Sequence, residues 1–355
     1  MSPELLTFQE GESLCSESEV CAEAFLIRSG KVRLSRKMGE MEIPYSLLGP
    51  GEILGAEAFD KSRILEYSAL ALDKTTVLPI SQGYLLDVKR NVETWLVPWI
   101  YDYINRYNIS ERPSLSNIAT LYSICNLFHS FLKIVNIGKS NDVLEGLSRP
   151  IQDEIRKNRS STRYLVEPVV NGLVQVGLID NRTNNPGNPA VVLPDEKLFM
   201  GFLIFIQNAA DLEAGLQENV FVLSPLKMHT SAEILLDGIL MDHELAGRLF
   251  EDERSMVHLS HERLFKLFEK ARNGSDNVSL EKGIDGLEKY GTFRKVFDNE
   301  NVSFFLHLRN ILRLNIRRDP VGNFVDILDF LLEQMYDARY TLRNNDVILN
   351  NDNML

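Results

Sequence analysis

The sequence predicts an α+β protein of several domains, with a small all-β module first and mostly helical regions after it. The chain has 355 residues, more than one hydrophobic core usually organises, so we expect two or three domains. Residues 8–80 contain short apolar runs cut by glycines, whereas later apolar residues recur at helical spacing. We place the domains at residues 1–80, 81–113, 114–200 and 201–355.

The composition excludes several other classes of protein. Hydrophobic residues make up 44% of the chain and charged residues 25%, a globular balance that excludes disordered, collagenous and disulfide-scaffold proteins. The longest apolar stretch, residues 200–206, is far shorter than the roughly 20 residues of a membrane helix, and the N-terminus carries acids where a signal peptide needs basic residues. We therefore expect a cytoplasmic protein with no membrane partner and with reduced thiols at Cys15, Cys21 and Cys125.

The all-β module is predicted from five apolar runs. These runs lie at residues 25–30, 31–35, 43–55, 67–72 and 75–80. After Ser81 the pattern changes, and apolar and aromatic residues recur every three or four positions through Tyr107. Such a stripe is typical of a helix that buries one face against its own domain or against a partner helix.

The next segment has the element order of a winged helix. Residues 116–137 form a predicted apolar helix, and further helices are predicted at 150–158 and 163–176. Two β-prone runs around an Asn/Pro/Gly turn follow before residue 194. Helix, helix, helix and hairpin is the order that a winged helix requires.

A shorter pattern recurs in the mostly helical C-terminal extension. Residues 284–293 resemble residues 170–179, which lie 114 positions earlier, and each segment ends a helix at a glycine before a predicted hairpin. We infer a second winged-helix-like unit at residues 255–310. A chance similarity between two helix ends is the alternative.

Charge is spread unevenly along the chain, whose formal net charge is -12. Residues 1–109 hold 11 basic and 16 acidic residues, residues 110–200 hold 10 and 9, and residues 201–355 hold 17 and 25. The middle segment is thus the only one of the three that is not acidic. It contains four cations within eight residues and no acid among them, namely Arg156, Lys157, Arg159 and Arg163.

Three stretches of the β module, AFLIRSGKVRLS, LGPGEILGAEAF and YSALAL, resemble the cyclic-nucleotide-binding domain of the cyclic-AMP receptor protein / fumarate-nitrate regulator family. This resemblance implies a double-stranded β-helix, or jelly roll, over the first 80 residues. The helix after it occupies the place of the dimerisation helix of the family, which implies a homodimer. The residues expected in the dimer contact are Val92, Trp95, Trp99 and Tyr103.

The middle segment resembles the winged helix-turn-helix of the same family. The core positions that carry this resemblance are Ile155, Val166, Val169, Val170, Leu173, Leu178 and Ile179. The resemblance implies double-stranded DNA as a partner, with Arg156, Lys157 and Arg159 on phosphates. Ser161 or Thr162 would cap the recognition helix, and Arg163 and Tyr164 would face base edges.

The recognition helix departs from the family pattern. Tyr164 and Pro168 replace polar readers, and Pro168 is expected to remove a backbone donor inside the helix. A winged helix used for protein contacts is therefore the alternative.

The ligand cassette also departs from the family pattern. A cyclic phosphate needs backbone N–H groups, a hydroxyl and an arginine, while an acid takes the ribose hydroxyl. Gly55 and Ser68 match, but Tyr67 stands where the family has arginine, and Ala56 stands where it has the acid, with Glu57 one step later. Arg63 is the nearest guanidinium.

We predict from this cassette a pocket for a cyclic nucleotide or another small anionic ligand. The residues that would line it are Gly55, Glu57, Arg63, Tyr67 and Ser68. No other cofactor is predicted. A retained β fold with an empty pocket, used for dimerisation or docking, is the alternative.

No motif indicates an enzyme or a metal site. His258, His261 and Glu262 lack a further ligand at metal spacing, and three cysteines are too few for an iron–sulfur cluster. Arg309, Arg313 and Arg317 form a basic stripe expected to pair with neighbouring carboxylates, or else to meet a partner.

The sequence therefore predicts a DNA-binding transcription regulator that responds to a signal. A protein partner is predicted at its C-terminal extension. The alternative is a signalling adaptor in which every module binds protein.

Overall fold

The computed structural model describes most of the chain. The described residues are 4–20, 23–38, 41–55, 64–65, 67–81, 113–136, 144–158, 160–182, 190–213, 223–248, 256–272, 278–298 and 301–352. They fall into two compact units. The N-terminal unit comprises residues 1–123, 205–220 and 328–355, and the central unit comprises residues 124–204 and 221–327.

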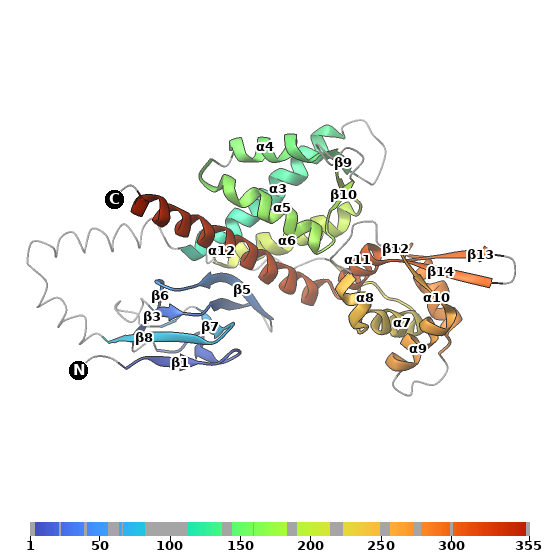
Figure 1. The fold of residues 1–355 in the computed structure, drawn as a ribbon, viewed down its shortest axis with the longest axis horizontal. Helices are drawn as coiled ribbons and strands as arrows, with labels where there is room; N and C mark the ends of the chain where they lie inside the picture. The colour runs from blue at the N-terminus through green and yellow to red at the C-terminus, as the bar shows by residue number, and fades with distance from the viewer. Residues whose placement is uncertain are drawn as a thin grey trace, which may run out of the picture. The chain divides into compact units, whose positions relative to one another are not determined.

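The β domain of the N-terminal unit consists of two four-stranded sheets, with strand orders β1-β8-β3-β6 and β2-β7-β4-β5 (Figure 1). Its strands are β1 Leu6–Phe8, β2 Ser13–Cys15, β3 Glu23–Ser29, β4 Val32–Met38, β5 Met41–Leu48, β6 Ile53–Leu54, β7 Ser68–Ala71 and β8 Thr75–Ser81. Each predicted run contains a strand. Along β4 the apolar Val32 and Leu34 are buried while Arg33 stays partly exposed, which is the alternation of a strand with one face on a core.

The first repeat, residues 113–213, contains the predicted helices and hairpin. Its elements are α3 Pro113–Val135, β9 Leu144–Leu147, α4 Ser148–Asn158, the 3₁₀ helix η2 Ser160–Leu165, α5 Val166–Gln175, β10 Asp180–Arg182, β11 Ala190–Leu193 and α6 Glu196–Glu213. Strand β9 pairs with β11 and was not predicted. All seven predicted core positions, from Ile155 to Ile179, are buried, which confirms that the apolar spacing marks the core.

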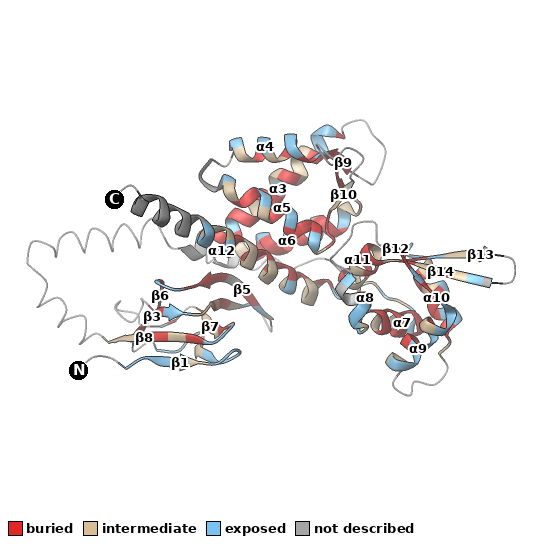
Figure 2. Ribbon diagram, in the orientation of Figure 1, coloured by how far each residue is buried: buried red, intermediate tan, exposed pale blue. Residues whose placement is uncertain are grey.

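The second repeat, residues 230–318, has a similar order of elements, with the additional helix α8 and, within its described residues, no counterpart of η2. Its elements are α7 Thr230–Leu240, α8 His243–Arg248, β12 Met256–Leu259, α9 His261–Arg272, α10 Leu280–Glu288, β13 Phe293–Asp298, β14 Asn301–His307 and α11 Leu308–Arg318. Its sheet order, β12-β14-β13, matches the order β9-β11-β10 of the first repeat. Figure 2 shows the buried faces of α7 and α10, which contribute Leu235, Ile239, Ile284 and Leu287 to one apolar core.

Two glycines mark the same position in both repeats. Gly177, with a φ of 79°, follows α5, and Gly291, with a φ of 67°, follows α10. A left-handed residue here ends the helix and turns the chain into the hairpin, and glycine adopts this conformation without steric cost. The predicted similarity between the two helix ends is thus present in the structure.

Helix α3 is the one described helix that is long and apolar enough, over residues 117–135, to meet the length and composition criteria for a membrane span. The apolar side chains of Ile124, Cys125, Phe128 and Leu132 in this helix are fully buried. Burial raises the pKa of the Cys125 thiol above its ordinary value. A buried core helix meets the same criteria, so they give weak evidence for a membrane span here.

Candidate DNA interface and ligand cassette

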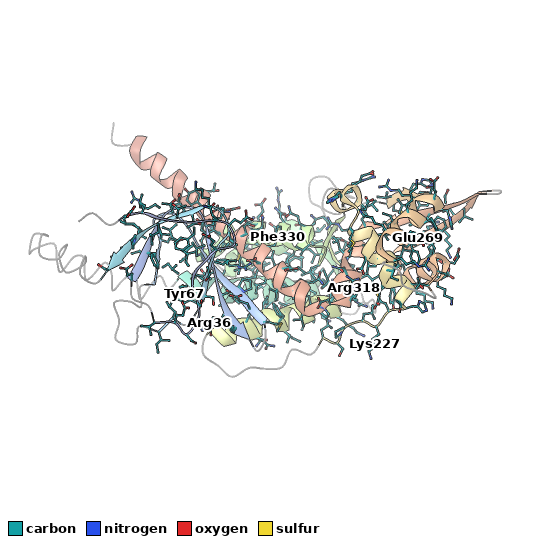
Figure 3. All side chains as sticks on the ribbon, turned by 90° about the horizontal axis from the view of Figure 1, so that it is seen from below. Arg36, Tyr67, Lys227, Glu269, Arg318 and Phe330 are labelled. Atoms are coloured by element: carbon teal, nitrogen blue, oxygen red, sulfur yellow. The ribbon has the colours of Figure 1, made fainter. Side chains whose placement is uncertain are left out.

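The ligand cassette lies at the end of β6 in the β domain. The Gly55 N–H donates a hydrogen bond of 3.1 Å to the hydroxyl of Tyr67, whose side chain is labelled in Figure 3. Tyr67 is 8% exposed, so this contact is buried. The Ser68 hydroxyl accepts a hydrogen bond of 3.1 Å from the Glu17 N–H.

Three of the residues that were expected to line the pocket, Gly55, Tyr67 and Ser68, therefore bind one another or the chain itself. The Tyr67 hydroxyl accepts the hydrogen bond of the Gly55 N–H, which a phosphate oxygen of the predicted ligand would otherwise accept. A ligand that uses this N–H must first displace a buried phenol. The other two predicted cassette residues, Glu57 and Arg63, lie outside the described residues, as do Val92, Trp95, Trp99 and Tyr103 of the predicted dimer contact.

The basic turn of the first repeat is partly neutralised by acids. Arg156 forms ion pairs of 3.2 Å with Glu167 and 3.5 Å with Asp153. Lys157 pairs with Glu154 at 3.0 Å. Glu167 comes from a different helix, eleven residues along the chain, so sequence spacing within one helix gave no sign of this contact.

Arg163 differs from these two cations. It is exposed on η2 and has no hydrogen bond or ion pair with any residue that the structure describes. Tyr164 beside it is half-buried. Arg159 lies outside the described residues, and of Ser161 and Thr162 the structure describes the backbone, which belongs to η2.

Two predictions about the recognition helix are wrong. Helix α5 begins at Val166 with Leu165 as its N-cap and no side-chain cap bond, so neither Ser161 nor Thr162 caps it. Pro168 is the third residue of α5, where a backbone N–H has no acceptor within the helix, so it removes no helical hydrogen bond. In an α-helix the proline ring would clash with the carbonyl of the residue four positions earlier. For Pro168 that residue is Tyr164, which lies in the 3₁₀ helix η2 and not in an α-helix.

The opposite end of α5 is covered by α11. Arg309 donates to the carbonyl of Val174 and, at 3.2 Å, to that of Gln175, while Arg313 donates to the carbonyl of Gly177 at 2.9 Å. Arg313 also pairs with Asp180, and Arg317 pairs with Asp195.

The predicted carboxylate partners therefore exist for Arg313 and Arg317, whereas Arg309 binds carbonyls. Burial lowers the pKa of Arg313, and the nearby Asp180 opposes this shift. At the other end of α5, Arg163 is exposed and Tyr164 is half-buried.

The equivalent helix of the second repeat, α10, is acidic. It carries Glu281, Asp285 and Glu288, and Lys295 of β13 forms ion pairs with Asp285 and, at 3.1 Å, with Glu288. A groove of about 280 Å³ between α9 and α10 is lined partly by Phe265, which is 50% exposed. This acidic face was not singled out from the sequence.

Two histidines of the second repeat, His258 and His261, lie close to phenylalanine rings. The His258 ring lies 5.4 Å from that of Phe305, and the His261 ring lies 6.1 Å from that of Phe304. Within the described residues no three His, Cys, Asp or Glu side chains converge as a metal site would require.

Comparisons with known proteins agree with the predicted resemblance. Residues 5–91 match the family model of the cyclic nucleotide-binding domain. Solved structures with likeness to this chain include the catabolite activator protein of Thermus thermophilus (20% identity, 57% of this chain and 91% of that chain, TM-score 0.29). Reduced CprK without ligand (15%, 56% and 92%, 0.28) and the EAL enzyme Bd1971 in a halfsite-occupied form (19%, 31% and 98%, 0.28) are also similar.

These TM-scores are too low to carry an argument about the whole chain, and no curated protein sequence matches it. The match of residues 5–91 confirms the predicted cyclic-nucleotide-binding-like domain.

Proposed function

We propose, from the premise that residues 5–91 form a divergent cyclic-nucleotide-binding domain, that this protein is a cytoplasmic, non-catalytic transcription regulator. In this proposal the β domain senses a signal, residues 81–113 form a homodimer, and the two repeats are winged helices. The first repeat binds double-stranded DNA. The observation that carries the proposal is the exposed Arg163 in the last turn of η2, which follows Arg156 and Lys157 in the last turn of α4.

The charges of the first repeat suit a duplex. Arg156, Lys157 and Arg159 are assigned to backbone phosphates, which fix the orientation of the protein, and Arg163 to a base edge, where an arginine pairs best with guanine. The acids beside Arg156 oppose this binding only weakly. Its ion pair with Glu167 is exposed, and exposed pairs contribute about 0–1 kcal/mol.

The cassette in this proposal takes a small anionic ligand in a way that differs from the cyclic-AMP receptor family. Tyr67 supplies no charge to a phosphate, and its hydroxyl already holds the Gly55 N–H. An arginine that pairs with a phosphate in a desolvated pocket contributes a few kcal/mol, so its replacement by tyrosine argues against tight binding of cyclic AMP.

A second function, that of a signalling adaptor, is favoured by the acidic face of α10. Glu281, Asp285 and Glu288 would repel a phosphate backbone, so the second repeat suits a protein partner better than DNA. Both functions can coexist in one chain, with DNA on the first repeat and protein on the second.

Selection of bound duplexes from a random DNA library at low salt tests the proposal. We expect the full-length protein to enrich a preferred site and its binding to weaken steeply as salt rises. If no sequence is enriched and no duplex binds at about 50 mM salt, the adaptor function replaces DNA binding.

Thermal-shift measurements with a panel of cyclic mono- and dinucleotides test the cassette separately. A ligand present at 100 times its dissociation constant stabilises the folded state by about 2.7 kcal/mol.

A further inference from the structure

The C-terminal helix α12, Pro320–Asp352, contacts the β domain within the N-terminal unit. Three of its acids, spaced four residues apart, meet two basic residues at the start of β4. Lys31 forms ion pairs of 3.2 Å with Glu333 and 3.1 Å with Asp337, and Arg33 pairs with Asp329 at 2.7 Å. Residues 329–340 of α12 are called the clasp below.

Tyr336 of the clasp lies between these acids and packs onto Gly49. The Lys31 ammonium is 5.5 Å from the centre of the Tyr336 ring, within the range of a cation–π contact. A β-carbon added to Gly49 would overlap the Tyr336 hydroxyl and lie 2.7 Å from its Cζ. Gly49 is absent from the residues with positive φ, so the space that Tyr336 takes explains a glycine here, and backbone strain does not.

The Tyr336 phenol is neutral in this contact. Burial, with the carboxylate of Glu52 as the next cause, raises the pKa of Tyr336 to about 12. Glu52 is 9% exposed and accepts a hydrogen bond of 2.7 Å from the Gly49 N–H. The Tyr336 phenol and the Glu52 carboxylate therefore both contact Gly49.

The segment from Gly49 to Gly55 connects this contact to the ligand cassette. Its first half is tied to β3, because the Gly51 N–H donates to the Ile27 carbonyl at 2.8 Å and the Ile27 N–H donates to the Glu52 carbonyl at 2.9 Å. Strand β6 then leads directly to Gly55, whose N–H is held by Tyr67. The clasp thus contacts one end of a short ordered segment whose other end is the cassette.

We propose that the clasp is a regulatory contact that holds the segment 49–55 in the state where Gly55 donates to Tyr67. Release of the clasp loosens this segment and frees the Gly55 N–H for an anionic ligand, and ligand binding in turn weakens the clasp, because coupling between two sites is reciprocal. The assignment of the cassette as a sensor rests on the proposed function.

The chemistry of the clasp suits a contact that opens. The side chains of its ion pairs are 27–55% exposed, so each pair is weak and is screened by salt. Leu331, Leu332 and Met335 of the same stretch are buried, so α12 keeps its apolar packing. The part of the clasp that can open consists of the partly exposed ion pairs and the contact of Tyr336 with Gly49.

Amide hydrogen exchange of the full-length protein tests the clasp through the ion pair of Arg33 with Asp329. In each of Arg33→Asp and Asp329→Arg, we expect exchange about twofold to fivefold faster in residues 329–340 and also at Gly51 and Gly55, because like charges replace the pair. The double variant, which restores opposite charges, should return both regions toward the wild-type rates. Lys266→Glu, a charge reversal in the exposed pair with Glu262, is the control and should change neither region.

Gly49→Ala tests the packing part of the clasp. We expect it to displace Tyr336 and to speed exchange as the charge variants do, whereas in a Tyr336→Ala background the same substitution should add nothing.

Two results would overturn the proposal. Unchanged exchange in residues 329–340 of the charge variants would mean that the clasp does not form, and faster exchange there with unchanged rates at Gly51 and Gly55 would mean that it does not control the cassette. Duplex binding by the same variants, measured in parallel, separates either failure from a failure of the DNA-binding function.

Discussion

The two repeats share most of their order of elements and differ in the charge at the helix that precedes the hairpin. In both, a glycine in the left-handed conformation ends this helix and leads into a hairpin. The first repeat presents the exposed Arg163 beside basic residues of α4, whereas α10 of the second presents Glu281, Asp285 and Glu288. Buried apolar positions and glycines therefore specify the shared fold, and the exposed positions between them are free to specialise.

The repeats also differ in their contacts with each other. Helix α11 of the second repeat directs arginines at the end of α5 in the first, and two of these, Arg309 and Arg313, are 7% and 9% exposed. Buried guanidinium groups are costly unless every polar partner is present. The contact thus makes the first repeat depend on α11 of the second for part of its stability.

Removal of the Arg313 guanidinium should give the largest effect. In Arg313→Met, Asp180 and the Gly177 carbonyl lose their partner, and loss of one member of a buried pair costs about 3–5 kcal/mol. Urea unfolding of the full chain measures this loss. The matched control is Arg318→Met, whose pair with Asp237 is 26% and 40% exposed and should contribute no more than about 1 kcal/mol. Equal destabilisation by the two variants would show that α11 does not support the first repeat in this way.

Substitution of Arg163 tests whether the first repeat reads DNA. We expect Arg163→Ala to weaken binding to the selected duplex by about 1–3 kcal/mol and to leave non-specific binding almost unchanged, because a base contact is lost while phosphate contacts remain. Fluorescence anisotropy with the selected and a scrambled duplex measures both. Lys282→Ala, in the first turn of α10, should change neither affinity. A larger loss from Lys282→Ala would reverse the roles assigned to the two repeats.

A smaller gain is expected when the acid that pairs with Arg156 is neutralised. Glu167→Gln removes the carboxylate 3.2 Å from Arg156 and should raise affinity for every duplex by no more than about 1 kcal/mol, since the pair is exposed. Glu281 occupies the equivalent place 114 residues later in α10, so Glu281→Gln is the matched control and should have no effect on duplex binding. The difference between the two glutamates disappears if DNA does not approach the first repeat.

Much of this fold could be predicted from the sequence, because local patterns report local structure. Apolar runs between glycines predicted β3 to β8 of the β domain, whereas β1 and β2 lie outside these runs. The spacing from Ile155 to Ile179 predicted core positions that are all buried. Strand β9 was missed because its four residues contain a glycine and no clear alternation. The start of the third helix was predicted at residue 163, three residues before α5 begins, so Pro168 was expected inside a helix whose first turn it occupies.

The candidate sites were harder to predict, since they depend on residues far apart in the chain. No periodicity relates Gly55 to Tyr67, Arg156 to Glu167, or Lys31 to acids about 300 residues later. The stripe of arginines on α11 was visible, but its targets at the end of α5 were not. Such contacts follow from the packing of whole elements, which a local pattern does not specify.

A last difference between the repeats should appear as the pH falls. Burial and then the charge of Arg294 lower the pKa of His307, at the end of β14 in the second repeat, below its ordinary value of 6.5. In the first repeat burial acts to raise the pKa of the Glu196 carboxyl, but hydrogen bonds and charges from Lys133 and His129 outweigh it and hold this pKa below its ordinary 4.5. A group whose pKa is lower in the folded state contributes fully to the free energy of unfolding above its ordinary pKa. This contribution is lost as the pH falls through the pKa of the folded state.

The contribution of His307 to the second repeat should therefore begin to fall below about pH 6.5, and that of Glu196 to the first repeat below about pH 4.5. Amide protection of β14 and of α5, corrected for the pH dependence of intrinsic exchange, measures the two repeats in one sample between pH 7 and pH 5. We expect protection to fall in β14 and not in α5, and His307→Gln, which cannot titrate, to remove the fall. An equal loss of protection in both repeats would mean that they open together. The contacts of α11 with α5 would then couple the two repeats so strongly that ionisation of His307 opens both.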